Sequence, residues 1–250
     1  MHRFFIANFD PTDRAIAIVD PVARQLRTVL RVTPGDRISV FDGSGGEWEL
    51  EIEHVGKTDV SASLVSAIKP VPSPSKQVTL LLGLARPERI ELAIQKCTEL
   101  GATRFIPVTS ERVQGGNTGT PSDKRLERWR RIIVEASEQS GRVTVPELTN
   151  PMPLSEAVKQ VTIEQPLLCL WEESDSRSTS LQSALRKNSG SEKLAALIGP
   201  PGGLSSDEVD EITSTGADLV TMGPRILRSE TAAITVMSAI LLDSGDLGGA

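Results

Sequence analysis

The sequence predicts an α/β protein of two parts, a small β-barrel or sandwich followed by a parallel sheet with helices on both of its faces. Three observations support this prediction. Short runs of alternating polarity occupy positions 3–68, three prolines lie within KPVPSPSK (69–76), and buried strands alternate with amphipathic helices from position 77 onward. Alternation with a period of two indicates half-buried strands, whereas the strand and helix rhythm indicates crossover connections between parallel strands.

The strand signals of the N-terminal part are clear in three segments. They are RISVF (37–41), EWELEIEHV (47–55) and DVSASLVSAI (59–68). The GSGG segment at 43–46 has the composition of a hairpin connection between the first two. Together these segments predict a small antiparallel sheet that curls into a barrel or a sandwich.

One helix is predicted within this part, over PVARQLRTVLR (21–31), where Pro21 suits the first helical turn. Four apolar residues share one face at helical spacing: Val22, Leu26, Val29 and Leu30. Three arginines fall on the opposite face at i, i+3 and i+7: Arg24, Arg27 and Arg31. Like charges repel one another unless an anion lies nearby, so these arginines are candidate RNA contacts. A solvated surface without a partner is the alternative.

The C-terminal part reads as a repeating series of strands and helices. The predicted strands are QVTLLLGLA (77–85), RFIPV (104–108), PLLCLW (166–171), LAALIG (194–199) and ADLVTMG (217–223). The predicted helices cover 87–101, 123–141, 180–187, 206–215 and 230–242. The last of these helices is apolar nearly all round, which predicts burial in the core or in a subunit interface.

Composition narrows the class of protein. A chain of 250 residues buries most of its apolar surface without disulfides, and Cys97 and Cys169 lie in apolar segments without metal-ligand spacing. The N-terminal residues lack the apolar core, about 7 to 15 residues long, of a signal peptide, and the apolar stretch 232–242 is shorter than the ~20 residues of a membrane span. We therefore expect a cytoplasmic protein with reduced cysteines, no metal and no membrane partner. The net charge of -6 argues against non-specific nucleic-acid binding but allows a local basic patch.

The segment LIGPPGGLSSDEVDEI (197–212) combines a strand end, a turn rich in glycine and proline, and a helix start. Ser205 and Glu208 have the spacing of a capping box, and Leu204 and Val209 have that of a hydrophobic staple. The helix start is therefore well specified by the sequence.

The same turn does not suit a phosphate group. Neither GxGxxG nor GxxxxGK[ST] is present, and Pro200 and Pro201 offer no N–H groups. A second turn of this kind occurs in MGPRILRSETAAITVM (222–237), where Ser229 is the expected N-cap of the last helix. Two such loops at neighbouring strand ends predict one pocket of backbone and apolar side chains, which suits an adenine ring and a methionyl chain.

Four segments of the chain resemble the RsmE family, the bacterial 16S ribosomal RNA (uracil-N3)-methyltransferases of the SPOUT superfamily. They are IGPPGGLSSDEVDE, MGPRILRSETAAITVMSAI, IELAIQKCTELGATRFIPVTSERV and VEASEQSGR. VLRVTPGDRISVFDGSGGEWELEI resembles the PUA-like RNA-binding domain of that family. The resemblance implies a homodimer that uses S-adenosylmethionine and acts on a uridine of 16S ribosomal RNA. The sequence leaves naked RNA and the assembled small subunit open as substrates, and the net charge of -6 favours the shaped surface of the assembled subunit. It also implies a deep trefoil knot in the C-terminal part, which periodicity alone does not indicate.

With the proline-rich segment as a boundary, the resemblance divides the chain into four parts. They are a PUA-like β-barrel domain that binds RNA (1–70), a linker (71–76), a SPOUT methyltransferase domain (77–244) and a flexible tail (245–250). Carried over residue by residue, it implies a cofactor pocket formed by Leu170, Ile198, Gly199, Gly203, Met222, Gly223, Ile226, Leu227 and Thr231. One position departs from the family, which usually has Gly-Pro-Glu-Gly-Gly where this chain has Pro201.

The RSET segment (228–231) matches the family signature beside the reacting base. Because tyrosine is absent and His2 and His54 both lie in the N-terminal part, the usual near-neutral base is missing from the predicted catalytic domain. We therefore assign catalysis to Arg228, which would favour the N3 anion of uracil, and to Glu230, which would orient Arg228 or accept a hydrogen bond. The alternatives are a surface salt bridge for Arg228 and a helix-dipole partner for Glu230.

Two other functions compete with this reading of the sequence. A SPOUT protein that methylates a ribose 2'-hydroxyl would share the fold, but the RSETA segment favours base methylation. A non-catalytic RNA-binding or ribosome-assembly protein that retains the fold is the second alternative, and Pro201 is its only indication.

Overall fold

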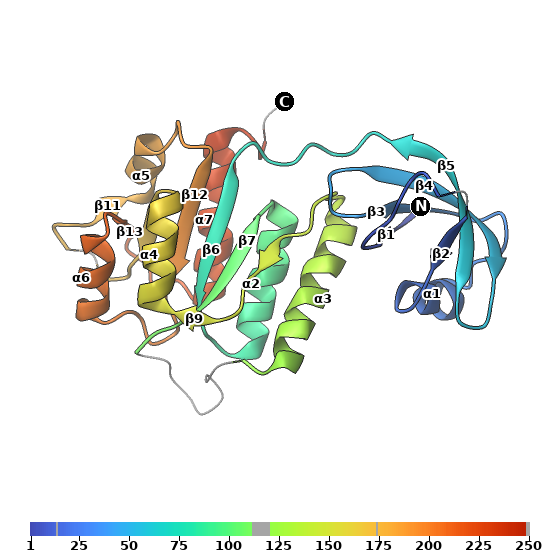
Figure 1. Ribbon diagram of the computed structural model, residues 1–250. Coiled ribbons are helices and arrows are strands. Elements are labelled where there is room, and N and C mark those ends of the chain that lie inside the picture. Colours follow the sequence, from blue (N-terminus) through green and yellow to red (C-terminus); the bar gives the residue numbers. More distant parts are fainter. Residues whose placement is uncertain (14, 112–120, 174, 249–250) are drawn as a thin grey trace. The chain divides into compact units, whose positions relative to one another are not determined.

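The computed structural model describes residues 1–13, 15–111, 121–173 and 175–248, which form two compact units (Figure 1). The first unit comprises Met1–Ser73 together with Ser137–Val145. The second comprises Pro74–Ala136 and Pro146–Ala250. The α/β fold class predicted from the sequence is confirmed, whereas the trefoil knot stays a prediction.

The first unit is built on a five-stranded sheet of order β1-β3-β4-β5-β2. Its strands are β1 (His2–Phe5), β2 (Ile16–Ile18), β3 (Arg37–Phe41), β4 (Glu47–Val55) and β5 (Val60–Ile68). β1 pairs with β3 in parallel, and the other pairs are antiparallel. Two register shifts between β4 and β5 mark irregularities of the kind that increase the twist of a strand pair. The strands β1 and β2 were not predicted, because four and three residues are too short to display a period of two.

The helical segment of the first unit differs from the predicted helix. It begins as α1 (Val22–Arg24) and continues as the π-helical segment η1 (Gln25–Leu30). The wider turn changes which residues share a face, so Leu26 is fully buried while Val29 is 70% exposed. The prediction that Val29 belongs to the buried face is therefore wrong.

The three candidate RNA-contacting arginines share no regular helical face either. Arg24 is exposed, and Arg31 ends the segment in the left-handed region at φ 53°. Arg27 is largely covered and pairs with Asp20 at 3.3 Å. The predicted spacing of i, i+3 and i+7 holds along the sequence, but the π-helical turn and the left-handed Arg31 depart from the regular helix that the prediction assumed.

Residues 137–145 join the first unit, although the sequence assigned them to the second domain. The cause is a set of polar contacts made by β1. The Arg3 guanidinium donates to the Glu47 carboxylate at 2.8 Å and also to the main-chain oxygens of Ser137 and Arg142. The Phe5 amide donates to the Glu138 carboxylate at 2.9 Å. These long-range contacts cannot be read from local sequence pattern.

The second unit contains a parallel sheet of order β11-β13-β10-β12-β6-β7-β8, with β9 paired to β7. Its strands are β6 (Gln77–Gly83), β7 (Arg104–Thr109), β8 (Glu147–Leu148), β9 (Met152–Pro153), β10 (Leu167–Leu170), β11 (Thr179–Ser180), β12 (Lys193–Ile198) and β13 (Asp218–Thr221). Its helices are α2 (Pro87–Leu100), α3 (Asp123–Ser140), α4 (Leu154–Glu164), α5 (Leu181–Lys187), α6 (Ser206–Ser214) and α7 (Ser229–Ser244).

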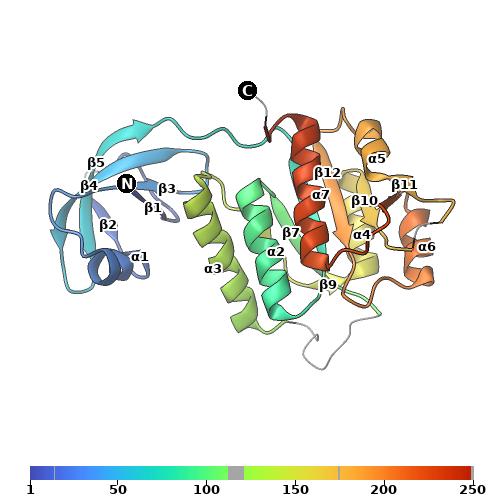
Figure 2. The same ribbon diagram turned by 180° about the vertical axis from the view of Figure 1, so that it is seen from behind.

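Helices cover both faces of this sheet, as predicted. α4 and α6 lie in front of it in Figure 1, whereas α2 and α7 lie in front of it in the opposite view of Figure 2. α4 was not predicted, although Leu154, Ala157, Val158 and Val161 have helical spacing and are all buried. α7 packs against α2 and buries seven residues, which agrees with the predicted burial of the last helix.

Both cysteines are buried and free, as expected from their apolar surroundings. Burial raises the pKa of Cys97 and of Cys169 to about 12, so both thiols are protonated near neutral pH. No helix in the described ranges is long and apolar enough to cross a membrane.

The start of α6 has the predicted capping box. The Ser205 hydroxyl accepts from the Glu208 amide at 3.2 Å, and the Glu208 carboxylate accepts from the Ser205 amide at 2.8 Å. Leu204 and Val209, the predicted staple, are both buried in one apolar cluster. The N-cap of α7 is different: Arg228 occupies that position, and Ser229 is the first helical residue. The prediction of Ser229 as N-cap is wrong because the extended conformation falls one residue earlier.

We expect Ser205→Ala to lower the free energy of unfolding by about 1 kcal/mol, because one helical N–H then loses its side-chain acceptor. Denaturant unfolding would measure this change. Ser206→Ala is the matched control, since Ser206 is exposed in the first turn and caps nothing. Equal stability of the two variants would contradict a capping role for Ser205.

Candidate functional site

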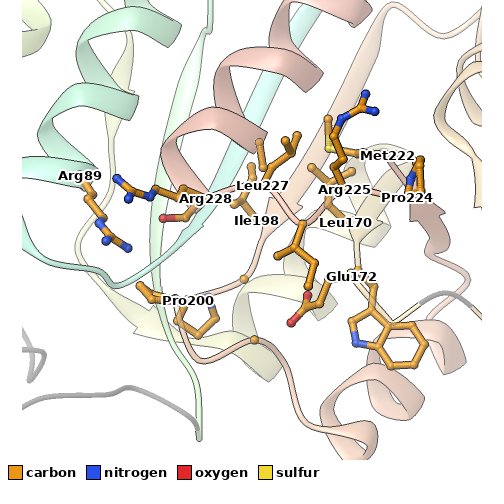
Figure 3. A pocket seen from close by; sticks show the side chains of 18 residues that line it. Arg89, Leu170, Glu172, Ile198, Pro200, Met222, Pro224, Arg225, Leu227 and Arg228 are labelled. Atoms are coloured by element: carbon orange, nitrogen blue, oxygen red, sulfur yellow. The ribbon is translucent and has the colours of Figure 1, made fainter.

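A cavity of about 320 Å³ lies where β10, β12 and β13 end (Figure 3). These strands are neighbours in the sheet, with β10 in the middle, so the loops that follow them meet at one edge. The carboxyl edge of a parallel sheet is the usual location of ligand sites in α/β proteins. The volume of the cavity falls in the range of small-molecule sites, which is about 300 to 1,000 Å³.

The first wall of the cavity is the loop from Gly199 to Gly203, which follows β12. The Gly203 amide donates to the Pro200 oxygen at 2.8 Å and closes the turn. Gly203 has φ 73°, a left-handed conformation that favours glycine, and a Cβ there would meet the Glu172 carboxylate. The turn therefore requires glycine for both its backbone angle and its space.

The last residue of β6, Gly83, supports this loop from behind. A Cβ on Gly83 would run into the backbone of Gly199 and Pro200. The two backbones are thus in direct contact, and the position of the loop depends on the absence of a side chain at Gly83. Sequence reasoning passed over this glycine because it ends an ordinary apolar strand.

The second wall is formed by residues 222–229, between β13 and α7. Gly223 has φ 104° and its amide donates to the Thr221 hydroxyl at 3.3 Å. Ile226 is 82% exposed, so a ligand in the cavity would cover an apolar side chain that water now contacts. This wall also carries Arg225 and Arg228.

The cavity brings together most of the residues predicted for the cofactor. Eight of the nine line it: Leu170, Ile198, Gly199, Gly203, Met222, Gly223, Ile226 and Leu227. Thr231 does not line it and is exposed on the first turn of α7. Sequence reasoning missed Arg89, Trp171 and Glu172, which also line the cavity. Trp171 and Glu172 directly follow β10, so their place after a strand was the signal that could have found them.

The two predicted catalytic residues have different surroundings. Arg228 lines the cavity, and no carboxylate of the described residues lies within ion-pair distance of it, so the alternative of a surface salt bridge is not seen. Glu230 is 9% exposed, does not line this cavity, and faces Arg89 of α2, with Oε1 4.0 Å from Nε. The structure therefore pairs Glu230 with Arg89, and the Glu230 carboxylate also accepts from the Ser229 hydroxyl at 3.4 Å. An ion pair of Glu230 with Arg228, the first of the two predicted roles, is not seen among the described residues.

Figure 3 shows the side chains of Arg89 and Arg228 on one side of the cavity and that of Arg225 away from them. The described residues include no group of three or more His, Cys, Asp or Glu side chains that could hold a metal ion. His2 and His54 lie in β1 and β4 of the first unit. Among the described residues that line the cavity, the charged side chains are three guanidinium groups and one carboxylate.

Comparison with known proteins assigns the chain to a family. The family described as an RNA methyltransferase domain matches residues 72–241, and the one described as an RNA methyltransferase PUA domain matches residues 26–65. The ribosomal RNA small subunit methyltransferase E of Mycobacterium bovis is 32% identical over 92% of this chain and 87% of its own length.

Two solved structures are also similar over most of the chain. The ribosomal RNA small subunit methyltransferase E of Neisseria gonorrhoeae, bound to S-adenosyl methionine, has a TM-score of 0.86 at 30% identity and covers 97% of each chain. A putative methyltransferase from Legionella pneumophila, in complex with the cofactor SAM, has a TM-score of 0.84 at 26% identity and covers 96% of each chain. The chain therefore belongs to the ribosomal RNA small subunit methyltransferase E family.

Proposed function

We propose that this protein transfers a methyl group from S-adenosylmethionine to N3 of a uridine in 16S ribosomal RNA. The observation that carries the proposal is the cavity at the ends of β10, β12 and β13, in a chain of this methyltransferase family. The similar structure from Neisseria gonorrhoeae was solved with S-adenosyl methionine. Membership in this family favours base methylation over ribose methylation and over a non-catalytic role.

The lining of the cavity fits this methyl donor. Pro200, Pro201 and Pro224 provide no N–H groups, which a triphosphate would need, whereas Leu170, Ile198 and Leu227 offer apolar contacts to an adenine ring. The remaining main-chain amides and carbonyls of the two loops can pair with the polar edge of the ring. Bound in this cavity, S-adenosylmethionine supplies an electrophilic methyl group.

Arg228 is the residue we assign to the reacting base. Its guanidinium lines the cavity and has no carboxylate partner among the described residues, so it is available to the uracil carbonyl oxygens as charge develops at N3. A preorganised donor of this kind is typically worth roughly 3 to 4 kcal/mol. Orientation of the two reactants can supply about 7 to 11 kcal/mol, whereas general-base catalysis contributes ~10²- to 10⁴-fold. Catalysis without a histidine or a tyrosine in the second unit is therefore feasible.

Glu230 acts on the reaction indirectly in this proposal. Its carboxylate is buried in the first turn of α7, where it also suits the helix dipole, and it faces Arg89. The Glu230 carboxylate thereby attracts the guanidinium of Arg89, which lies at the same side of the cavity as Arg228. For Thr231, a role in cofactor binding remains a proposal that would require a movement of the first turn of α7.

We further propose the domain roles that the resemblance implies. Residues 1–70 form the RNA-binding PUA-like domain, 71–76 the linker and 77–244 the methyltransferase domain, and Arg24, Arg27 and Arg31 contact RNA. The tail 245–250 lies partly outside the described residues, and in its described part Asp246 accepts from the Ser75 amide and hydroxyl, at 2.9 Å each. A homodimer that acts in the cytoplasm on the assembled small subunit completes the proposal.

Two measurements test this function. Calorimetry with S-adenosylmethionine should show saturable binding to the purified protein, and a protein without such binding would not be a methyltransferase. Small subunits from a strain that lacks the gene should gain one N3-methyluridine when they are incubated with the purified protein and S-adenosylmethionine. Mass spectrometry of RNA fragments detects this nucleotide. Methylation of a ribose, or an unchanged set of N3-methyluridines in the deletion strain, would overturn the proposal. Naked 16S RNA in a parallel reaction separates the two possible substrates.

A further inference from the structure

Glu172 is an acidic side chain in a cavity whose other charged groups are basic. It is the second residue after β10, is exposed, and lines the cavity together with Arg89, Arg225 and Arg228. It is the only carboxylate in the lining of this cavity, as far as the described ranges extend. No Lys, Arg or His of the described residues lies within ion-pair distance of it, so its negative charge is not neutralised within the protein.

The position of Glu172 is set by the loop that forms the first wall. Its carboxylate oxygen occupies the space that a Cβ of Gly203 would need. This contact places the carboxylate beside the turn 199–203, which carries Pro201. In Figure 3 the side chain of Glu172 lies between Leu227 and the turn that carries Pro200. An acceptor without a cationic partner in the described part of the chain therefore lies on the wall that the proposed methyl donor would contact.

Electrostatics favours such an acceptor for this ligand. S-adenosylmethionine carries a sulfonium, an ammonium and a carboxylate, and is therefore a net cation. Three guanidinium groups in the lining would disfavour a cation, because like charges at short range repel in a partly dehydrated site. One carboxylate with free lone pairs counters this repulsion and accepts hydrogen bonds from the ligand.

We propose that Glu172 binds the methyl donor by accepting a hydrogen bond from its ribose hydroxyls or from its α-ammonium group. This inference rests on the proposed function, because it assigns a residue to the cavity of S-adenosylmethionine. It adds a binding residue that the family resemblance did not carry to this chain.

Calorimetry with three ligands tests the proposal on wild-type protein and on Glu172→Ala, Glu172→Gln and Glu173→Gln. The ligands are S-adenosylmethionine, S-adenosylhomocysteine and 5'-methylthioadenosine, which lacks the amino-acid part. We expect Glu172→Ala to bind S-adenosylmethionine about ten- to hundredfold more weakly, because a charge-assisted hydrogen bond is lost. Glu172→Gln should lose less affinity for S-adenosylmethionine, because its amide oxygen still accepts a hydrogen bond. Glu173→Gln, the matched control, should bind as the wild type does, because Glu173 does not line the cavity.

The three ligands distinguish the two sources of the hydrogen bond. If Glu172→Ala loses the same affinity for all three ligands, the ribose hydroxyls donate the hydrogen bond. If it loses affinity only for S-adenosylmethionine and S-adenosylhomocysteine, the α-ammonium group donates it. Unchanged affinity of both Glu172 variants overturns the inference while the proposed function stands. A wild-type protein that does not bind S-adenosylmethionine overturns both. Thermal unfolding should be the same for all variants, because Glu172 and Glu173 are both exposed.

Discussion

Arg228→Ala should reduce the rate of methyl transfer by about a hundred- to a thousandfold while S-adenosylmethionine binds within about threefold of its wild-type affinity. The reason is that the Arg228 guanidinium stabilises charge that appears only as N3 of the uracil loses its proton. A group that acts on the transition state changes the rate without a matching change in ground-state binding. Single-turnover methylation of small subunits gives the rate, and calorimetry gives the affinity.

Two matched variants make this result specific. Arg225→Ala removes a guanidinium from the same loop, but Figure 3 shows that Arg225 extends away from Arg228 and Arg89. We therefore expect at most about a tenfold loss of rate for Arg225→Ala. Arg228→Lys keeps the charge but not the forked geometry, and should fall between wild type and Arg228→Ala. A normal methylation rate for Arg228→Ala would remove Arg228 from the mechanism.

The sequence predicted the second unit well because its signals are local. Buried strands followed by amphipathic helices gave the parallel sheet, and the spacing of Ser205 and Glu208 gave the start of α6. The two turns rich in glycine and proline gave the cavity, since the carboxyl ends of neighbouring parallel strands meet at one edge of a sheet. These features need no knowledge of distant contacts.

Features that depend on distant contacts were not predicted. The π-helical turn at Gln25–Leu30 exposes Val29, although the residue types there fit an ordinary helix. The pairing of Glu230 with Arg89 joins α7 to α2 across 141 positions of the sequence, so no motif could indicate it. Such a pair depends on how the two helices pack against each other, which the residue types alone do not reveal.

Gly83 is the clearest case of a site residue that only the structure identifies, and its substitution should have a large effect. Gly83→Ala places a methyl group against the backbone of Gly199 and Pro200, where no flexible side chain can move aside. The loop 199–203 must then shift, and a misplacement of about 1 Å can reduce a catalytic rate about a hundredfold. We expect a loss of this size in methyl transfer, together with weaker binding of S-adenosylmethionine.

Because the added methyl group overpacks the end of β6, Gly83→Ala should also lower the free energy of unfolding by about 1 to 3 kcal/mol. Denaturant unfolding would measure this change. Gly190→Ala is the matched control, because a Cβ at Gly190 meets no atom within 4 Å. If Gly83→Ala is less stable but binds S-adenosylmethionine as the wild type does, the loop 199–203 does not form the wall of the donor site. If the affinity for S-adenosylmethionine and the rate of methyl transfer both fall while the protein remains folded, the position of the loop 199–203 controls the reaction. Gly83 itself has no side chain that could contact a ligand, so the effect must act through that loop.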